Sequence, residues 1–193
     1  GYHQVMYFTI STGIGGAVLF DGKPLAGSQG LASEFGHMIV EPGGRRCTCG
    51  GRGCLESVAS GTSIAQIARE RAAKSETLLN VLAEGSGTIT AGTVFEAYEK
   101  GDELARAIVG EVAYRLGIAL ANVVSAFDPD IVVLGGGVMN SAHILLPPAV
   151  DYVERHLAVR GAKAPPIEAS DIHDDVALWG ALALARGAGE EGL

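Results

Sequence analysis

The chain has 193 residues and a formal net charge of −8, with 14 Lys and Arg against 22 Asp and Glu. That length allows one ample domain or two small ones. The acidic balance argues against a free-standing nucleic-acid or anionic-membrane binder, which needs a basic surface. The strongest apolar run, residues 116–127, is shorter than the roughly 20 residues of a membrane span. The 193 residues contain no charged segment followed by an apolar one, the pattern of a secretory signal peptide.

Two strands are predicted near the start, over residues 5–11 and 17–20, with a glycine-rich break between them. Asp21-Gly22 is a strong hairpin-turn signal. A short strand is predicted over residues 37–40, and a turn-rich loop over residues 43–53 follows it.

The middle of the chain is predicted to be helical. A helix over residues 62–73, capped by Ser60 or Thr62, is followed by two short helices over residues 75–83 and 93–99. A long helix then runs from Asp102 to Phe127. Apolar residues step by four along it, at Leu104, Ile108, Val112, Leu116 and Leu120. Gly117 interrupts this helix at a cost of about 1 kcal/mol, which indicates close packing there.

Strands and helices alternate in the last third. Residues 131–134 form a continuous apolar run, typical of a strand buried on both faces. A helix over residues 143–158, a strand over 167–169 and a closing helix over 176–186 follow. This order predicts an α/β architecture.

All three cysteines, Cys47, Cys49 and Cys54, lie in one glycine-rich loop. An odd number of close cysteines is a poor disulfide framework, which favours a reducing, cytoplasmic setting. With His37 they complete a closed, structural tetrahedral Zn²⁺ set. Such a site has no position for water, so we expect Zn²⁺ to organise the loop and to do no chemistry. The alternative is three buried, inert thiols beside a surface histidine.

Two glycine clusters are candidate phosphate or nucleotide sites. Thr12 and Gly13 begin the first, where backbone N–H groups and the Thr12 hydroxyl can cradle a phosphate; a plain hairpin turn is the alternative. Gly135, Gly136 and Gly137 follow the buried strand, where open α/β sheets bind ligands. A packing glycine run is the competing interpretation, because neither a P-loop nor a full dinucleotide fingerprint is present.

Two glutamates flank the metal loop. Glu34 precedes His37 by three residues, and Glu56 follows Cys54 by two. If Zn²⁺ fixes the loop, both carboxylates are held near one point. Carboxylates accept hydrogen bonds from sugar hydroxyls, which favours a polyol site. The alternative is that both are solvated surface acids, the usual place of Glu.

Three stretches together resemble one family: Leu31-Ala32-Ser33-Glu34-Phe35-Gly36-His37, Cys47-Thr48-Cys49-Gly50-Gly51-Arg52-Gly53-Cys54-Leu55-Glu56 and Ser60-Gly61-Thr62. These stretches are similar to motifs of the ROK family (repressors, open reading frames and sugar kinases). They most resemble the motifs of its bacterial glucokinase branch. Residues 11–16 and 134–138 stand where that family has its second phosphate loop and its adenosine loop. The zinc loop with its glutamates is highly specific; the glycine loops are not.

The resemblance implies an actin-like ATPase (ribonuclease H-like) fold, of which this chain is the larger, C-terminal lobe. It implies ATP-dependent phosphorylation of a hexose, with glucose favoured, at the 6-hydroxyl and with Mg²⁺. Glu34 and Glu56 would hold sugar hydroxyls. One nitrogen of His37 would ligate Zn²⁺, and the other would face the sugar.

The same resemblance places the nucleotide. Thr12 and Gly13 would approach the transferred phosphate, while Gly135, Gly136 and Gly137 would lie against the nucleoside. Similar family members are commonly dimers, and the long apolar helix offers surface for self-association. We therefore expect a cytoplasmic homodimer that binds a hexose and ATP but neither membrane nor nucleic acid.

The family's N-terminal lobe carries an Asp-x-Gly-Gly-Thr phosphate loop and ends with the catalytic aspartate. Neither motif occurs in these residues. Asp21, Asp128 and Asp130 occupy predicted turns and match no family position. Phosphoryl transfer depends on orienting the nucleophile, so we expect no catalytic residue here and little kinase activity from this chain alone.

Two other functions stay open. One is the sugar-sensing domain of a ROK transcriptional repressor, which keeps the zinc loop and carries a helix-turn-helix domain upstream. The other is a structural zinc-loop module without a ligand, against which the clustered glutamates count. Within the kinase interpretation, N-acetylmannosamine, fructose and other hexoses are alternatives to glucose, and polyphosphate is an alternative to ATP.

Overall fold

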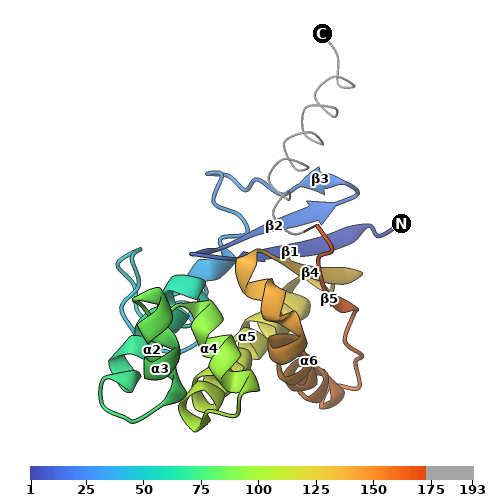
Figure 1. Ribbon diagram of the computed structural model, residues 1–193. Coiled ribbons are helices and arrows are strands. Elements are labelled where there is room, and N and C mark those ends of the chain that lie inside the picture. Colours follow the sequence, from blue (N-terminus) through green and yellow to red (C-terminus); the bar gives the residue numbers. More distant parts are fainter. Residues whose placement is uncertain (173–193) are drawn as a thin grey trace.

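The computed structural model describes residues 1–172 as a sheet with helices packed beneath it (Figure 1). The predicted closing helix over residues 176–186 lies outside the described residues. Five strands form the sheet: β1 (Gln4–Ile10), β2 (Ile14–Phe20), β3 (Lys23–Pro24), β4 (Ile131–Gly135) and β5 (Ile167–Ala169). The α/β architecture is therefore confirmed for the part of the chain that the structure describes.

The sheet is mixed, with strand order β3-β2-β1-β4-β5. Strands β1 and β2 pair antiparallel, and the break between them is only residues 11–13. The predicted hairpin turn at Asp21-Gly22 is confirmed and joins β2 to β3. Strand β1 pairs in parallel with β4, so that Phe8 lies opposite Leu134. Met6, Phe8 and Ile10 alternate along β1 and are fully buried on the helical side. This period-2 pattern turns one face of the sheet into the core.

Six α-helices and two 3-10 helices are described: η1 (Phe35–His37), α1 (Glu56–Ala59), α2 (Gly61–Ala72), α3 (Leu78–Ser86), α4 (Ala91–Glu99), α5 (Glu103–Phe127), η2 (Gly137–Ser141) and α6 (Ala142–Ala158). Ser60 caps α2 by accepting from the Ser63 N–H, and Asp102 caps α5 by accepting from the Ala105 N–H. These side chains satisfy backbone donors that the first turn leaves open. Helix α3 begins three residues after its predicted start.

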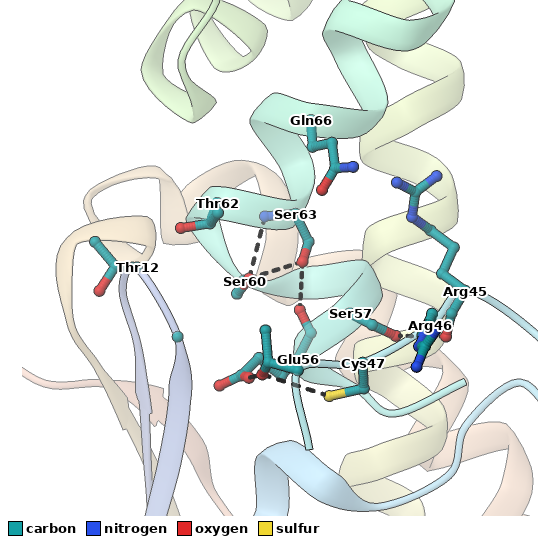
Figure 2. Close-up of a pocket in the computed structure, with 12 residues that line it drawn as sticks. Thr12, Arg45, Arg46, Cys47, Glu56, Ser57, Ser60, Thr62, Ser63 and Gln66 are labelled. Atoms are coloured by element: carbon teal, nitrogen blue, oxygen red, sulfur yellow. Dashed lines mark hydrogen bonds between the residues drawn. The ribbon is translucent and has the colours of Figure 1, made fainter. Parts of the chain in front are cut away.

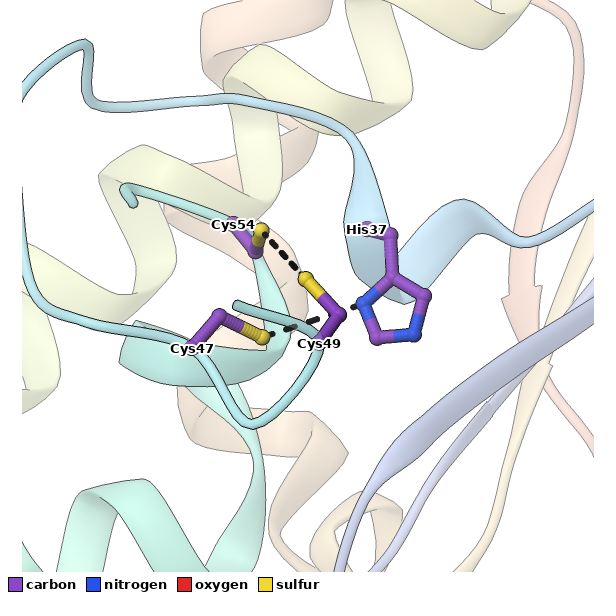
Figure 3. A group of neighbouring side chains, drawn as sticks. All are labelled: His37, Cys47, Cys49 and Cys54. Carbon is purple, nitrogen blue, oxygen red and sulfur yellow. Dashed lines mark hydrogen bonds between the residues drawn. The ribbon is translucent and has the colours of Figure 1, made fainter. Parts of the chain in front are cut away.

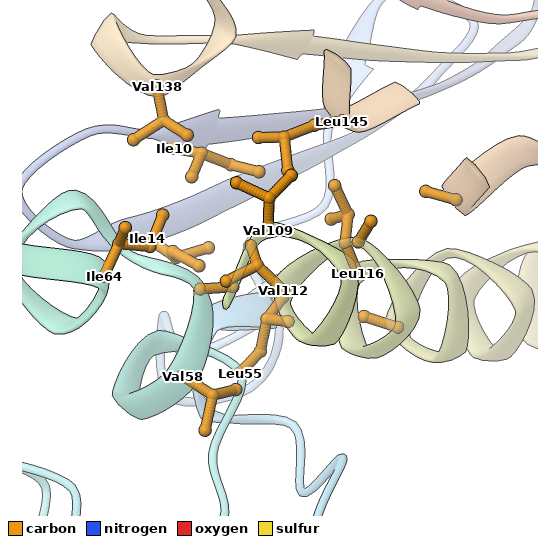
Figure 4. Packing of buried hydrophobic residues seen from close by; sticks show 14 of the residues in the cluster. Ile10, Ile14, Leu55, Val58, Ile64, Val109, Val112, Leu116, Val138 and Leu145 are labelled. Carbon is orange, nitrogen blue, oxygen red and sulfur yellow. The ribbon is translucent and has the colours of Figure 1, made fainter. Parts of the chain in front are cut away.

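Helix α5 is the centre of the core. Val109, Val112 and Leu116 lie in one buried cluster with Ile10 and Ile14 of the first two strands (Figure 4). The helix is long and apolar enough to cross a membrane by length and composition, but 61% of its apolar window is buried inside the protein. That burial is typical of a core helix.

The predicted close packing at Gly117 is confirmed. A Cβ added there would lie 2.8 Å from the Cβ of Tyr152 on α6. The two helices approach closely because α5 has no side chain at this crossing, where Gly117 meets Tyr152.

The strand predicted over residues 37–40 is wrong. The chain forms η1 over Phe35–His37, and only an isolated bridge joins Ile39 to Cys54. The Phe35 ring stacks on Phe8 at 4.6 Å, and Gly36 packs so tightly on the Ile14 carbonyl that a Cβ would overlap it. These contacts turn the chain under the sheet. The apolar run was too short to distinguish a strand from a single tertiary anchor.

Candidate functional site

His37, Cys47, Cys49 and Cys54 converge on one point (Figure 3). Their ligand atoms all lie within 4.8 Å of one another. The Sγ atoms of Cys49 and Cys54 are 3.7 Å apart, and Cys47 Sγ is 3.8 Å from His37 Nδ1. Tetrahedral Zn²⁺ with Zn–S bonds of about 2.3 Å separates its sulfurs by about 3.8 Å. The chemistry and spacing of these donors fit Zn²⁺.

The loop curls around this point through two glycines in the left-handed region, Gly50 (φ 93°) and Gly53 (φ 75°). The Gly50 N–H donates to the Cys47 carbonyl at 3.0 Å, closing a tight turn. The pKa of the Cys54 thiol is raised, mainly because the thiol is buried. The pKa of the exposed Cys49 thiol is lowered, mainly by a hydrogen bond from the Gly51 backbone N–H. The positive φ angles of Gly50 and Gly53 let the loop curl so that the thiols converge.

The Glu56 carboxylate is fixed where the loop enters α1. Its Oε2 accepts from the Ile14 N–H at 2.9 Å, and its Oε1 accepts from the Thr48 hydroxyl at 3.3 Å. A Cβ on Gly13 would lie 2.7 Å from Oε2, so glycine makes room for this carboxylate. Glu56 is thus held against the β1–β2 turn, unlike a freely solvated surface acid.

Glu34 lies on the other side of the cluster. Its Oε2 is 3.9 Å from His37 Nε2, while the Nδ1 of the same ring faces Cys47. One ring nitrogen therefore faces the thiols and the other faces a carboxylate. Glu34 does not line the hollow that Glu56 lines. The two glutamates flank the metal loop in the sequence, and each contacts a different part of it.

A first hollow of about 530 Å³ opens between the β1–β2 turn, the metal loop and α2 (Figure 2). Most of the residues that line it are polar, among them Thr12, Thr48, Glu56, Ser60, Thr62 and Gln66. Several hydroxyls and one fixed carboxylate can exchange hydrogen bonds with a polyol. Thr48 and Gln66 were not predicted to belong to a site, and Ser60 and Thr62 were predicted only as helix caps and as part of the family resemblance.

A second hollow of about 540 Å³ lies on the other side of the turn. It has apolar walls as well as polar ones, among them Thr12, Thr62, Ile89, Phe95, Gly137 and Asn140. An apolar cleft with a few polar groups suits a flat aromatic ligand. Ile89, Phe95 and Asn140 were missed, because they look like ordinary core and loop residues in the sequence.

Gly135, Gly136 and Gly137 lie at the end of β4 and directly after it. One of them lines a hollow that a ligand could enter, and the other two serve packing. Gly137 lines the second hollow. Gly135 and Gly136 do not: a Cβ on Gly135 would overlap the Tyr7 hydroxyl, and a Cβ on Gly136 (φ 92°) would lie 2.6 Å from the Ile10 carbonyl oxygen. These two glycines let β4 pack against β1.

The two hollows meet at Thr12 and Thr62, which line both. The Gly61 N–H donates to the Ser11 carbonyl at 2.7 Å, which ties the start of α2 to the β1–β2 turn. Two ligands bound at the same time would therefore face each other across one turn of backbone.

The three turn aspartates line neither hollow. Asp130 accepts hydrogen bonds from the N–H groups of His3 and Gln4, and Asp21 pairs with the His3 ring at 2.7 Å. Asp128 ends α5 in the left-handed region. All three hold turns, as the sequence indicated.

The sequence pattern of the ROK family matches residues 1–188. A glucokinase of Halalkalibacterium halodurans is 37% identical over 182 residues, which is 93% of this chain and 55% of that enzyme. The ROK hexokinase of Thermus thermophilus superimposes with a TM-score of 0.87 at 33% identity, covering 100% of this chain and 60% of that one. A ROK glucokinase of Streptomyces griseus in complex with glucose and AMPPNP superimposes with a TM-score of 0.85 at 32% sequence identity. The match covers 97% of this chain and 62% of that one.

The chain thus spans between 55% and 62% of the length of these three proteins. The structural likeness confirms the α/β fold that was expected from the sequence, that of the actin-like ATPase sugar kinases.

Proposed function

The chain belongs to the ROK family, and from this premise we propose that it is the larger lobe of an ATP-dependent kinase that phosphorylates the 6-hydroxyl of glucose. ATP with Mg²⁺ is the phosphoryl donor in this proposal, and Zn²⁺ is a structural ion. The whole protein is proposed to be a cytoplasmic homodimer.

The meeting of the two hollows at Thr12 and Thr62 carries the proposal. One hollow presents hydroxyls and the fixed Glu56 carboxylate, which suit a sugar. The other presents the apolar side chains of Ile89 and Phe95, which suit a nucleoside. A kinase must hold its two substrates side by side, because phosphoryl transfer depends on positioning.

On the sugar side, we assign Glu56 as a hydrogen-bond acceptor for a hexose hydroxyl. Two protein donors already orient its carboxylate, so little freedom is lost when the sugar binds. Glu34 and the Nε2 of His37 bind further hydroxyls in this assignment. His37 Nδ1 and the three thiolates hold Zn²⁺, whose contribution when bound is to fix the loop.

On the phosphate side, Thr12 and Gly13 lie at the turn shared by both substrates. Backbone N–H groups of such a turn stabilise negative charge on a transferred phosphoryl group. Gly137 lies against the nucleoside, and Gly135 and Gly136 support it by letting β4 approach β1. No residue of this chain is assigned as the general base, which the other lobe supplies in this proposal.

Calorimetry on the zinc-loaded chain tests the proposal. We expect glucose and a non-hydrolysable ATP analogue each to bind, and each to bind tighter when the other is present. We expect no steady ATP turnover by this chain alone, and glucose-dependent turnover when the residues encoded upstream of Gly1 are included. Polyphosphate in place of ATP identifies the donor, and N-acetylmannosamine and fructose in place of glucose identify the sugar.

The sequence upstream of Gly1 separates the kinase from the repressor. An Asp-x-Gly-Gly-Thr loop and an Asn-Asp pair support the kinase. A helix-turn-helix segment without the catalytic aspartate would instead identify the whole protein as a sugar-sensing repressor and contradict the kinase proposal. Light scattering on the purified protein tests the homodimer, for which the half-exposed Tyr114 on α5 is a candidate contact.

A further inference from the structure

Two arginine–glutamate pairs connect the metal-binding loop with the helices beside it, and a third pair joins those two helices to each other. The distances are 2.7 Å for Arg115–Glu41, 2.7 Å for Arg45–Glu70 and 2.8 Å for Arg71–Glu111. Glu41 and Arg45 belong to the loop, Glu70 and Arg71 to α2, and Glu111 and Arg115 to α5. Most of these side chains surround a hollow of about 150 Å³ between the loop and the two helices.

Arg115 is the most protected arginine of the three, with 19% of its side chain exposed. Its Nη2 donates to Glu41 Oε1 at 2.7 Å, and its Nε donates to Oε2 at 3.3 Å. Its Nη1 donates to the Glu111 carbonyl at 3.2 Å, which anchors the guanidinium on its own helix. A planar, forked arginine held in this way fixes the direction of the carboxylate as well as its distance.

Glu41 in turn fixes the far end of the loop. Its N–H donates to the Gly53 carbonyl at 3.2 Å. The two backbones are so close that a Cβ on Gly53 would overlap the Glu41 carbonyl. Gly53 directly precedes Cys54, and Glu56 follows two residues later. A shift of Glu41 must therefore move a metal ligand and the carboxylate of the first hollow.

Little else holds the loop to the helices. Of residues 41–53, only Cys47 and Gly53 are buried. Burial of apolar side chains therefore contributes little to the loop's position. The four metal ligands join parts of the loop to one another and to η1, but none of them belongs to α5.

We propose that Arg115 is a positioning residue for the metal-binding loop, which it holds on α5 through Glu41. It thereby controls how firmly the loop retains Zn²⁺ and how well Glu56 is placed for a sugar. The effect of Arg115 on Zn²⁺ retention follows from these loop contacts alone. Its effect on sugar binding rests on the proposed function.

The test is the rate at which a colorimetric chelator, 4-(2-pyridylazo)resorcinol, removes Zn²⁺ from the loaded chain. We expect Arg115→Met and Glu41→Gln each to release Zn²⁺ about tenfold faster, as is common when supporting partners of a metal site are lost. The double variant should be no faster than Arg115→Met alone, because both substitutions act on the same interaction. Arg155→Met is the matched control: it breaks the exposed Arg155–Asp151 pair on α6 and should leave release unchanged.

Unchanged release in Arg115→Met and Glu41→Gln, or rates that multiply in the double variant, would overturn the proposal. Arg115→Lys keeps the charge without the fork, and we expect an intermediate rate. If Arg115→Met does not fold by circular dichroism, Glu41→Gln, which keeps its shape, decides the question alone.

Ligand binding separates positioning from general stability. We expect Arg115→Met to weaken glucose binding and to leave the affinity for a non-hydrolysable ATP analogue unchanged. Equal weakening of both would contradict a positioning role. If the unaltered chain binds no glucose, the proposed function fails, and the Zn²⁺ release rates still decide whether Arg115 positions the loop.

Discussion

The carboxylate of Glu56 lies directly against the backbone of Gly13, where a Cβ would come within 2.7 Å of its Oε2. One residue ends the metal-binding loop, and the other lies in the turn between the first two strands. Their contact joins the loop to the turn that borders both hollows. Substitutions at either residue should therefore affect the same function.

Gly13→Ala should weaken hexose binding about tenfold or more. The new methyl group displaces the Glu56 carboxylate from the Ile14 N–H, and losing one charge-assisted hydrogen bond has about that effect. Gly110→Ala on α5 is the control, because its Cβ would meet nothing within 4 Å. Calorimetric titration with glucose measures both variants. Equal glucose affinity in the two would show that the Gly13–Glu56 contact is irrelevant to the sugar.

Glu56→Gln should lower hexose affinity while Zn²⁺ stays bound. The amide oxygen can still accept from Ile14, but a neutral acceptor binds a sugar hydroxyl less strongly than a carboxylate does. We expect a loss of about tenfold in affinity. Glu84→Gln on the exposed side of α3 is the matched control. Undiminished glucose binding in Glu56→Gln would remove Glu56 from the site.

Cys49→Ser should abolish stoichiometric Zn²⁺ binding, because three ligands do not complete a closed tetrahedral site. Without the ion, residues 37–56 should exchange their amide hydrogens faster. Thr48→Ser, which keeps the neighbouring hydroxyl, should retain the metal. Metal analysis of the purified variants gives the answer, and one Zn²⁺ per chain in Cys49→Ser would disprove the ligand set.

Replacing either of two glycines on α5 with alanine should change the stability of the fold, in opposite directions at the two positions. Gly117→Ala forces a methyl group against Tyr152 and should destabilise the fold by about 1–3 kcal/mol. Gly110→Ala meets nothing within 4 Å and should stabilise the helix by about 0.5–1 kcal/mol. Urea unfolding compares them. A stabilised Gly117→Ala would mean that α5 and α6 are not in close contact.

Asp102→Ala should destabilise the chain in a pH-dependent manner. Burial opposes ionisation of Asp102, but hydrogen bonds from the Ala105 N–H, the Thr77 hydroxyl and the Leu78 N–H prevail and lower its pKa. A lowered carboxyl pKa stabilises the fold above its ordinary value near 4 and loses that effect as pH falls through the folded value.

We therefore expect Asp102→Ala to cost about 1 kcal/mol at pH 7, the usual effect of a lost helix cap, and less at pH 3. Asp102→Asn, a competent cap at both pH values, is the control. Urea unfolding at the two pH values measures the difference. A deficit that does not shrink at pH 3 would show that the charge is unimportant.

Local patterns explain what the sequence predicted well. The Asp102 cap and the four-residue steps from Leu104 to Leu120 depend only on helix geometry, so α5 was foreseen almost to the residue. The convergence of His37 with the three cysteines was foreseen because residues of this chemistry are rare and concentrated in one loop.

Pairings across the chain were not predictable in the same way. Alternation along β1 shows which residues face the core, but not that Phe8 lies beside Leu134 rather than beside another strand. The bond from Gly61 to Ser11, which makes Thr12 and Thr62 neighbours, joins two segments that have no shared pattern. The polar and apolar hollows thus depend on tertiary contacts that a single sequence does not encode locally.

The parallel pairing of β1 with β4 also sets an order of events on the ribosome. Val5 lies opposite Ile131, so the first strand waits for residue 131 before it gains its inner neighbour. At roughly 5–20 residues per second, that wait lasts roughly 6–25 seconds. During this interval Met6, Phe8 and Ile10 have no complete core to cover them. The nascent hairpin therefore exposes an apolar face until residues more than a hundred positions later cover it.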